Sequence, residues 1–183
     1  LHTMFSMGVP VSGKNLFPSN ISGLPTWYIL RVSDRGYQAP GDRTHIQIIM
    51  NKATWDDDIA NCLPGTLILF NEDVKMPVDR DDCIVIGVPM TKMARGLNPK
   101  LGRMISNMIY VGLLAEILEL DQDKLNGAIS NQFKGKERAI ELNLEAINLG
   151  RAFINENVDT DMIPYRIENR EVDDDVFLIE GNE

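Results

Sequence analysis

Three short, almost entirely apolar segments lie in the middle of the chain, and they limit its possible folds most strongly. They cover residues 45–50, 66–70 and 83–87. Short apolar segments of this kind are typical of strands that are covered on both faces, as in parallel sheets. A helix over residues 55–60 is predicted between the first two, because Thr54 suits an N-cap and aspartates follow in the first turn. This order predicts an α/β fold with a Rossmann-like open, mostly parallel sheet flanked by helices.

Helical periodicity marks the second half of the chain. Residues 136–155 place apolar side chains at steps of three and four, which makes one core-facing stripe. Residues 101–119 are apolar on nearly all sides, and a shorter helix is predicted over 123–132. The 101–119 segment is short and carries Arg103 and Glu116, so we do not expect it to span a membrane.

A glycine- and proline-rich run over residues 12–25 predicts a loop that leads into a strand over residues 26–34. Long loops that end on a rigid strand often carry binding groups. The polar residues of this loop are Lys14, Asn15, Ser19, Asn20 and Ser22. From their chemistry alone, a binding loop and an ordinary surface loop are equally good interpretations.

The same run carries a family resemblance. Residues 12–33 have the sequence SGKNLFPSNISGLPTWYILRVS. This resembles the pattern S-G-K-N-x-F-P-S-N-I-x-G-L-P-T-W-Y-x-x-R-V-S in the gamma domain of 2-oxoacid:acceptor (ferredoxin) oxidoreductases. The similarity is greatest to the form that is fused to the N-terminus of the alpha subunit, as in 2-oxoglutarate or pyruvate:ferredoxin oxidoreductases. Further fitting positions, which extend the resemblance over the whole chain, are Met50-Asn51, Val88 to Thr91, Asn107 with Gly112, and residues 133–143.

The resemblance implies a CoA-dependent oxidative decarboxylation of a 2-oxoacid to an acyl-CoA, carbon dioxide and reduced ferredoxin. It favours 2-oxoglutarate over pyruvate. The implied cofactors are thiamine diphosphate, Mg²⁺, an iron–sulfur cluster and coenzyme A, none of them held by this chain alone. The implied partners are the beta subunit, the remainder of the alpha subunit and ferredoxin. Residues 1–155 would form the gamma domain, and residues 156–183 an extended linker into a missing thiamine-diphosphate-binding domain.

The chain departs from the family pattern at its N-terminus. The gamma domain of the family opens with a strand and a glycine-rich G-x-G-G-x-G turn that leads into a helix. This chain instead begins at Leu1 with what is predicted to be the end of a helix closed by Gly8. We therefore expect the sequence to be a piece of a longer polypeptide, cut at both ends.

Composition excludes several classes of function. The net charge of −9 and the pI of about 4.7 argue against binding to nucleic acids or anionic membranes, although a few local cations can still bind a phosphorylated ligand. Cys62 and Cys83 are too few for an iron–sulfur cluster. Two lone cysteines and no visible signal peptide favour a cytoplasmic location. His2 and His45 lack the context of a catalytic triad, and neither a metal-ligand spacing nor a Walker loop is present, so no catalytic residue is expected.

Loop cations and polar groups remain as candidates for ligand binding. Thr91 and Lys92 follow the last apolar segment, and open α/β sheets bind ligands in loops at the carboxyl ends of their strands. We expect this pair and the first loop to meet an anionic ligand, either the phosphates of coenzyme A or the carboxylate of the 2-oxoacid. The expected binding residues are Lys14, Asn15, Ser19, Asn20, Thr91 and Lys92. Two other functions stay open, namely an assembly domain without a ligand and a stand-alone nucleotide-binding module.

Overall fold

The computed structural model describes residues 1–16, 26–39, 41–172 and 177–178. The chain forms two compact units, each assembled from segments that are far apart in the sequence. The first unit contains residues 1–40, 114–144 and 165–183. The second unit contains residues 41–113 and 145–164.

The second unit is built on a three-stranded parallel sheet in the order β3-β4-β5. The strands are β3 (Ile46–Ile49), β4 (Leu67–Asn71) and β5 (Ile84–Val88). Leu67 in the central strand lies opposite Ile46 on one side and Ile84 on the other. The three apolar segments therefore form the parallel sheet that the sequence predicts, which confirms the Rossmann-like α/β fold.

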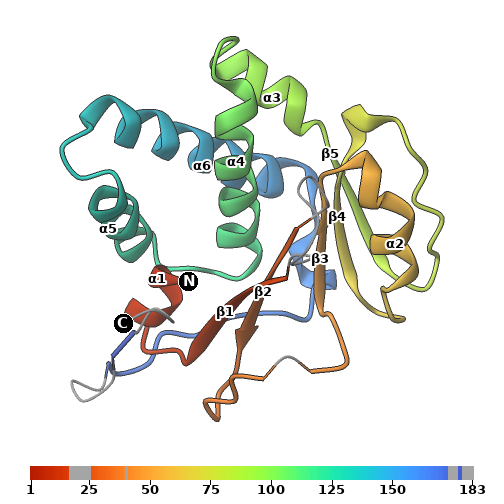
Figure 1. Cartoon of the computed structure of the whole chain (residues 1–183), viewed down its shortest axis with the longest axis horizontal. Helices are drawn as coiled ribbons and strands as arrows, with labels where there is room; N and C mark the ends of the chain where they lie inside the picture. The colour runs from red at the N-terminus through yellow and green to blue at the C-terminus, as the bar shows by residue number, and fades with distance from the viewer. Residues whose placement is uncertain (17–25, 40, 173–176, 179–183) are drawn as a thin grey trace. The chain divides into compact units, whose positions relative to one another are not determined.

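Helix α2 (Trp55–Ala60) lies on one side of this sheet (Figure 1). A buried cluster of Ile49, Trp55, Cys62 and Ile68 joins the helix to the strands. The Trp55 indole also donates a hydrogen bond to the Pro77 carbonyl at 2.9 Å, so the ring is fixed at its polar end as well.

The start of α2 differs from the prediction in one detail. Thr54 precedes the helix as expected, but its side chain does not cap the backbone. The Thr54 hydroxyl instead donates to the buried Asp58 carboxylate at 2.7 Å, and Asn51 caps the short 3₁₀ turn η1 (Lys52–Thr54). A buried carboxylate needs such a donor, which explains why the hydroxyl is used there.

Two long helices, α4 (Gly102–Ile117) and α6 (Glu137–Asn157), belong partly to each unit. Within the second unit they approach closely at two glycines. A β-carbon on Gly112 would overlap the Ile147 carbonyl oxygen, and one on Gly150 would overlap the Ile109 carbonyl oxygen. The helices can pack at this distance only because neither glycine has a side chain.

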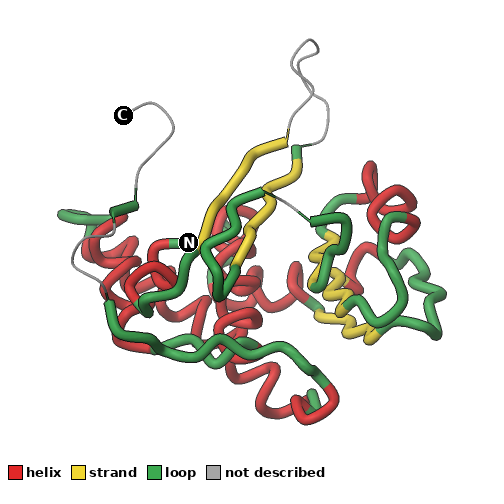
Figure 2. Tube along the Cα trace, turned by 90° about the horizontal axis from the view of Figure 1, so that it is seen from below, coloured by secondary structure: helices red, strands yellow, loops and turns green. Residues whose placement is uncertain are grey.

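The first unit contains a two-stranded antiparallel hairpin of β1 (Val11–Leu16) and β2 (Trp27–Val32), which run side by side in Figure 2. The loop predicted to begin at residue 12 is thus wrong for residues 12–16, which form a strand. Gly13 permits this pairing. The Tyr28 hydroxyl and the Leu1 side chain occupy the space that a β-carbon at this position would fill.

Helices α1 (His2–Ser6) and α5 (Gln122–Gln132) complete the first unit, together with an extended C-terminal segment over residues 165–172. Gly8 closes the turn after α1 at a φ of +74°, as predicted. Within the described ranges, no helix has both the length and the apolar character that a membrane span requires.

Candidate functional site

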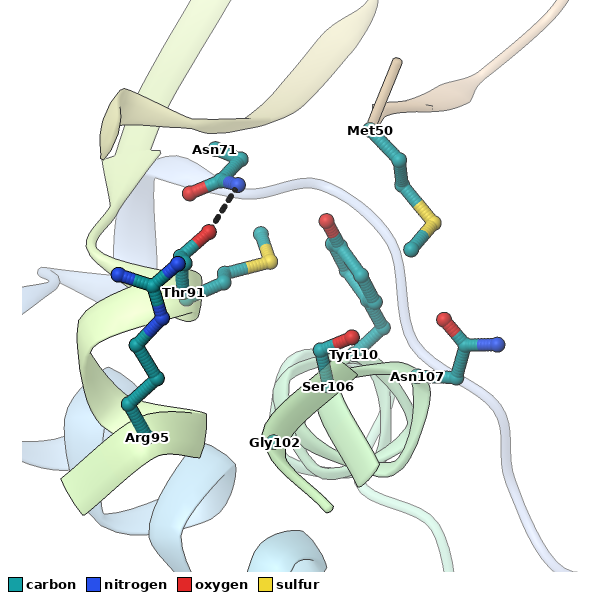
Figure 3. A pocket seen from close by; sticks show the side chains of 9 residues that line it. Met50, Asn71, Thr91, Arg95, Gly102, Ser106, Asn107 and Tyr110 are labelled. Atoms are coloured by element: carbon teal, nitrogen blue, oxygen red, sulfur yellow. Dashed lines mark hydrogen bonds between the residues drawn. The ribbon is translucent and has the colours of Figure 1, made fainter. Parts of the chain in front are cut away.

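A cavity of about 500 Å³ lies within the second unit, where the three parallel strands end (Figure 3). Met50 follows β3, Asn71 ends β4, and Met90 and Thr91 follow β5. Cavities of this volume accept small organic ligands. The carboxyl ends of parallel strands are also where open α/β sheets bind ligands. This cavity is therefore the best candidate site in the described part of the chain.

Helix α4 provides a second wall of the cavity. Gly102, Ser106 and Tyr110 follow one another at four-residue steps and so lie on one face of the helix. Asn107 adds an exposed amide beside them. The wall combines an aromatic ring with three different hydrogen-bonding groups.

Tyr110 is almost completely buried, with 5% of its surface exposed. Its hydroxyl points toward Asn71 and Met50 across the cavity (Figure 3). Burial raises the pKa of this hydroxyl, so it stays protonated at neutral pH and can donate a hydrogen bond. In the part of the chain that the structure describes, no side chain or backbone group bonds this hydroxyl.

Asn71 and Thr91 form the polar side of the opposite wall. The Asn71 amide nitrogen donates to the Thr91 hydroxyl oxygen at 2.9 Å (Figure 3), while the Asn71 amide oxygen accepts from the backbone N–H of Asp73 at 3.3 Å. Asn71 is buried, and both ends of its side chain are satisfied within the protein. It is therefore a structural member of the wall.

Helix α3 (Met90–Leu97) begins directly after β5 and brings a cation to the site. Its N-terminus is capped by a distant residue, because the Asp73 carboxylate accepts from the Lys92 backbone N–H at 2.9 Å. Arg95 lies one turn after Thr91 and therefore on the same face of α3. Arg95 is the one charged residue among the described residues that line the cavity.

The predicted ligand-binding residues that the structure describes belong to two different units. Thr91 lines the cavity, whereas Lys92 is exposed and does not line it. Both residues lie in the first turn of α3, so the loop predicted for them is wrong. Lys14 and Asn15 are exposed on strand β1 of the first unit.

Ser19 and Asn20, the remaining two predicted residues, lie outside the described residues. The ligand role of all six residues stays a prediction. Of the nine described residues that line the cavity, the sequence singled out only Thr91 for binding, and the residues that it missed include Asn71, Arg95, Ser106 and Tyr110. The sequence does contain a signal for them, because side chains four residues apart share one face of a helix. Arg95 comes four residues after Thr91, and Tyr110 comes four residues after Ser106 within the predicted helix over residues 101–119.

Metal binding finds no support among the described residues, which contain no cluster of three or more histidine, cysteine, aspartate or glutamate side chains. Cys62 and Cys83 are both free thiols. Asp58, from the acidic start of α2, is engaged by Thr54. These residues therefore do not fit an iron–sulfur cluster or a Mg²⁺ ion.

The sequence matches the profile of one known protein family. The sequence profile described as "Pyruvate ferredoxin/flavodoxin oxidoreductase" matches residues 1–153. The fold resembles 2-oxoglutarate:ferredoxin oxidoreductase from Magnetococcus marinus, solved with 2-oxoglutarate, coenzyme A and succinyl-CoA bound, with a TM-score of 0.85 and 24% identity over 99% of this chain. That match spans 32% of the Magnetococcus chain, so the present chain is about a third as long.

A second solved structure is the gamma subunit of the keto/oxoacid ferredoxin oxidoreductase from Geobacter sulfurreducens PCA. It matches with a TM-score of 0.63 and 13% identity, over 81% of this chain and 85% of that subunit. A comparison with curated protein sequences gave no match. Because the family profile covers far more than half of the sequence, the chain belongs to the pyruvate ferredoxin/flavodoxin oxidoreductase family.

Proposed function

We propose that this chain is the gamma portion of a 2-oxoacid:ferredoxin oxidoreductase. In the reaction, a 2-oxoacid, coenzyme A and two oxidised ferredoxins give an acyl-CoA, carbon dioxide, a proton and two reduced ferredoxins. The observation that carries the proposal is the match of the family profile to residues 1–153, which includes every described residue of the cavity. The fold match over 99% of the chain to an enzyme of this type supports it.

The chain would act as one part of a larger assembly in the cytoplasm. We propose that residues 1–155 form the gamma domain and that residues 156–183 lead into the domain that helps to bind thiamine diphosphate. The beta subunit, the remainder of the alpha subunit and ferredoxin would be its partners. When bound in the complex, thiamine diphosphate with Mg²⁺ would supply the decarboxylation chemistry, and an iron–sulfur cluster would pass electrons to ferredoxin.

The contribution of this chain would be to bind and orient an anionic substrate. The cavity fits this role because Arg95 and the hydroxyls of Thr91 and Tyr110 are donors, and no carboxylate is among the described residues that line it. Lys14, Asn15, Ser19, Asn20 and Lys92 would add contacts to coenzyme A or to the 2-oxoacid. Among substrates we favour 2-oxoglutarate, the ligand named for the Magnetococcus enzyme.

A turnover assay tests the proposal directly. The full-length polypeptide would be co-expressed with its beta partner and loaded with thiamine diphosphate, Mg²⁺ and iron–sulfur cluster. Coenzyme A-dependent reduction of a viologen dye would then be followed with 2-oxoglutarate, pyruvate and a branched-chain 2-oxoacid in turn. We expect turnover with 2-oxoglutarate to exceed turnover with the other two.

Each alternative gives a different result in the same assay. Higher turnover with pyruvate would keep the reaction and correct the substrate. No turnover with any 2-oxoacid, from a fully loaded complex, would contradict the proposed reaction. A purely structural gamma portion would show cavity variants that assemble less complex but keep the wild-type rate per assembled complex.

A further inference from the structure

The side chains of the cavity present hydrogen-bond donors to its interior, and one of these donors is unpartnered. The Tyr110 side chain is almost completely buried, but its hydroxyl points into the cavity (Figure 3) and has no bonding partner among the described residues. It is not among the described side-chain polar atoms that are both buried and unpartnered, so it is reached from the cavity. It is therefore available to a ligand that accepts a hydrogen bond there.

The orientation of the Asn71 amide follows from its neighbours. A backbone N–H can only donate, so the Asn71 atom that faces the Asp73 N–H at 3.3 Å must be the amide oxygen. The amide nitrogen then faces Thr91 and donates to the Thr91 hydroxyl oxygen at 2.9 Å. The side chain cannot flip without placing two donors against each other.

This orientation decides what Thr91 offers to a ligand. Its hydroxyl oxygen accepts from Asn71, so the hydroxyl hydrogen is left to point elsewhere. In the described part of the chain, no acceptor is bonded to that hydrogen. Thr91 therefore serves as a second donor beside Tyr110.

We infer that the cavity binds the oxyanion of a small organic ligand, a phosphate or a carboxylate, and that Asn71 is a positioning residue that turns the Thr91 hydroxyl hydrogen toward it. Arg95 supplies the matching positive charge, since guanidinium groups pair well with both kinds of oxyanion. The Lys92 backbone N–H is not available to the ligand, because the Asp73 carboxylate accepts from it at 2.9 Å.

The walls indicate the rest of the ligand. Met50, Met90 and the Tyr110 ring give the cavity an apolar lining beside its polar groups. A volume of about 500 Å³ suits a ligand larger than an inorganic ion. The ligand is thus an organic molecule with an anionic end. The inference itself rests on the cavity, and only the choice of probes rests on the proposed function.

Three substitutions separate the positioning effect from general damage. Thr91→Val keeps the shape of the side chain and removes the hydroxyl, whereas Thr91→Ser keeps the hydroxyl. Asn71→Asp keeps the shape but places a carboxylate oxygen against Thr91, so the Thr91 hydroxyl donates to residue 71 and turns away from the ligand. We expect Thr91→Val and Asn71→Asp to weaken ligand binding about tenfold and Thr91→Ser to retain it.

The Asn71→Asp variant also adds a negative charge, and a double variant removes this ambiguity. In a Thr91→Val background no hydroxyl remains to be turned, so only the charge effect should persist. We expect Asn71→Asp to weaken binding at least threefold less in that background than in the wild type. Equal effects in the two backgrounds would overturn the positioning role of Asn71.

Binding would be measured by isothermal titration of the assembled, full-length complex. The probes are coenzyme A and inorganic phosphate as phosphate sources, and 2-oxoglutarate as the carboxylate source. An effect of the variants on coenzyme A alone would identify the oxyanion as phosphate, and an effect on 2-oxoglutarate alone would identify it as carboxylate. In turnover, the variants should raise the KM for that same ligand about tenfold and leave kcat within about twofold.

Two further cavity variants, Arg95→Met and Tyr110→Phe, should also weaken binding. Their matched controls are Lys100→Met and Tyr37→Phe, which change residues outside the cavity and should bind the probe as the wild type does. Wild-type binding of every probe by the Tyr110, Thr91 and Arg95 variants would overturn the inference, as would no binding of any probe to the wild type. If the variants alter phosphate or coenzyme A binding but no 2-oxoacid is turned over, the cavity inference stands and the proposed reaction fails.

Discussion

Cys62 and Cys83 show how residue-scale surroundings decide the reactivity of a thiol. Cys62 is buried, and its thiol donates to the Asp58 carbonyl oxygen at 3.2 Å. Burial, with a smaller effect from Cys83, raises the pKa of Cys62 from 9.0 to about 11. Burial also raises the pKa of Cys83. Both side chains are therefore neutral thiols at physiological pH and poor nucleophiles.

The raised pKa of Cys62 predicts a loss of stability in alkali. Below pH 9 the Cys62 thiol is protonated in both the folded and the unfolded chain, so its ionisation does not lower the free energy of unfolding. Between pH 9 and about 11 only the unfolded chain releases the proton, which lowers the free energy of unfolding by up to roughly 2 kcal/mol. Urea unfolding of the wild type and of Cys62→Ala at pH 8 and pH 10.5 measures this loss. A difference between the two proteins that does not change with pH would contradict the prediction.

The ligand-binding residues show which part of the site the sequence could predict. Thr91 was predicted because it follows a strand, and the structure places it on the cavity wall. The sequence predicts Lys92 together with Thr91, because a loop is expected to follow the last apolar segment. Helix α3 begins at Met90 instead, and helical spacing then selects Thr91 and Arg95 for the same face. Asn71 and Tyr110 depend on contacts between separate elements, which a linear pattern does not reveal.

At the scale of elements, the packing of α4 against α6 depends on two glycines. The sequence predicts both helices and their apolar faces, because periodicity reports which side of a helix is buried. It does not report how closely two helices approach. The structure shows that backbone carbonyls of Ile147 and Ile109 occupy the space beside Gly112 and Gly150.

Adding one methyl group at this crossing should therefore destabilise the protein. Gly112→Ala and Gly150→Ala should each lower the free energy of unfolding by roughly 2–3 kcal/mol, because the obstructing atoms are backbone and cannot swing aside. Gly127→Ala in α5 is the matched control, since nothing lies within 4 Å of its added methyl group. That control should stabilise the protein by about 0.5–1 kcal/mol through helix propensity. Urea unfolding of the three variants tests the contrast, and equal effects would refute the packing argument.

At the scale of the whole molecule, the chain passes repeatedly between its two units. Length alone predicts a single domain, and the loss of apolar pattern after residue 155 predicts a linker. The structure gives two units, and it shows part of the predicted linker bound to the first unit. The Ile167 backbone N–H donates to the Leu118 carbonyl at 3.0 Å, and the Arg170 backbone N–H donates to the Met7 carbonyl at 2.8 Å. Backbone pairing of this kind requires no distinctive side chains, so sequence patterns do not reveal it.

Gly8 holds the residue 165–172 segment against the first unit. Its φ of +74° favours glycine, and an added β-carbon would lie 2.8 Å from the Arg170 carbonyl oxygen and 2.7 Å from that of Glu171. Gly135 has a similar φ of +80° but nothing within 4 Å. Alanine at either position should cost about 1–2 kcal/mol in backbone strain, while alanine at position 8 should in addition displace the segment.

Amide hydrogen exchange can separate these two effects. We expect Gly8→Ala to speed exchange of the Ile167 and Arg170 amides at least tenfold relative to Gly135→Ala, because their acceptors, the Leu118 and Met7 carbonyls, are lost only when the segment lifts off. At all other amides, both variants should speed exchange by the same small factor, because both place alanine at a positive φ and carry the same backbone strain. Equal protection of the two amides in both variants would show that the segment is held by its other contacts, such as the 2.6 Å ion pair between Arg166 and Glu119. The C-terminal segment would then be fixed by its side chains rather than by the turn at Gly8.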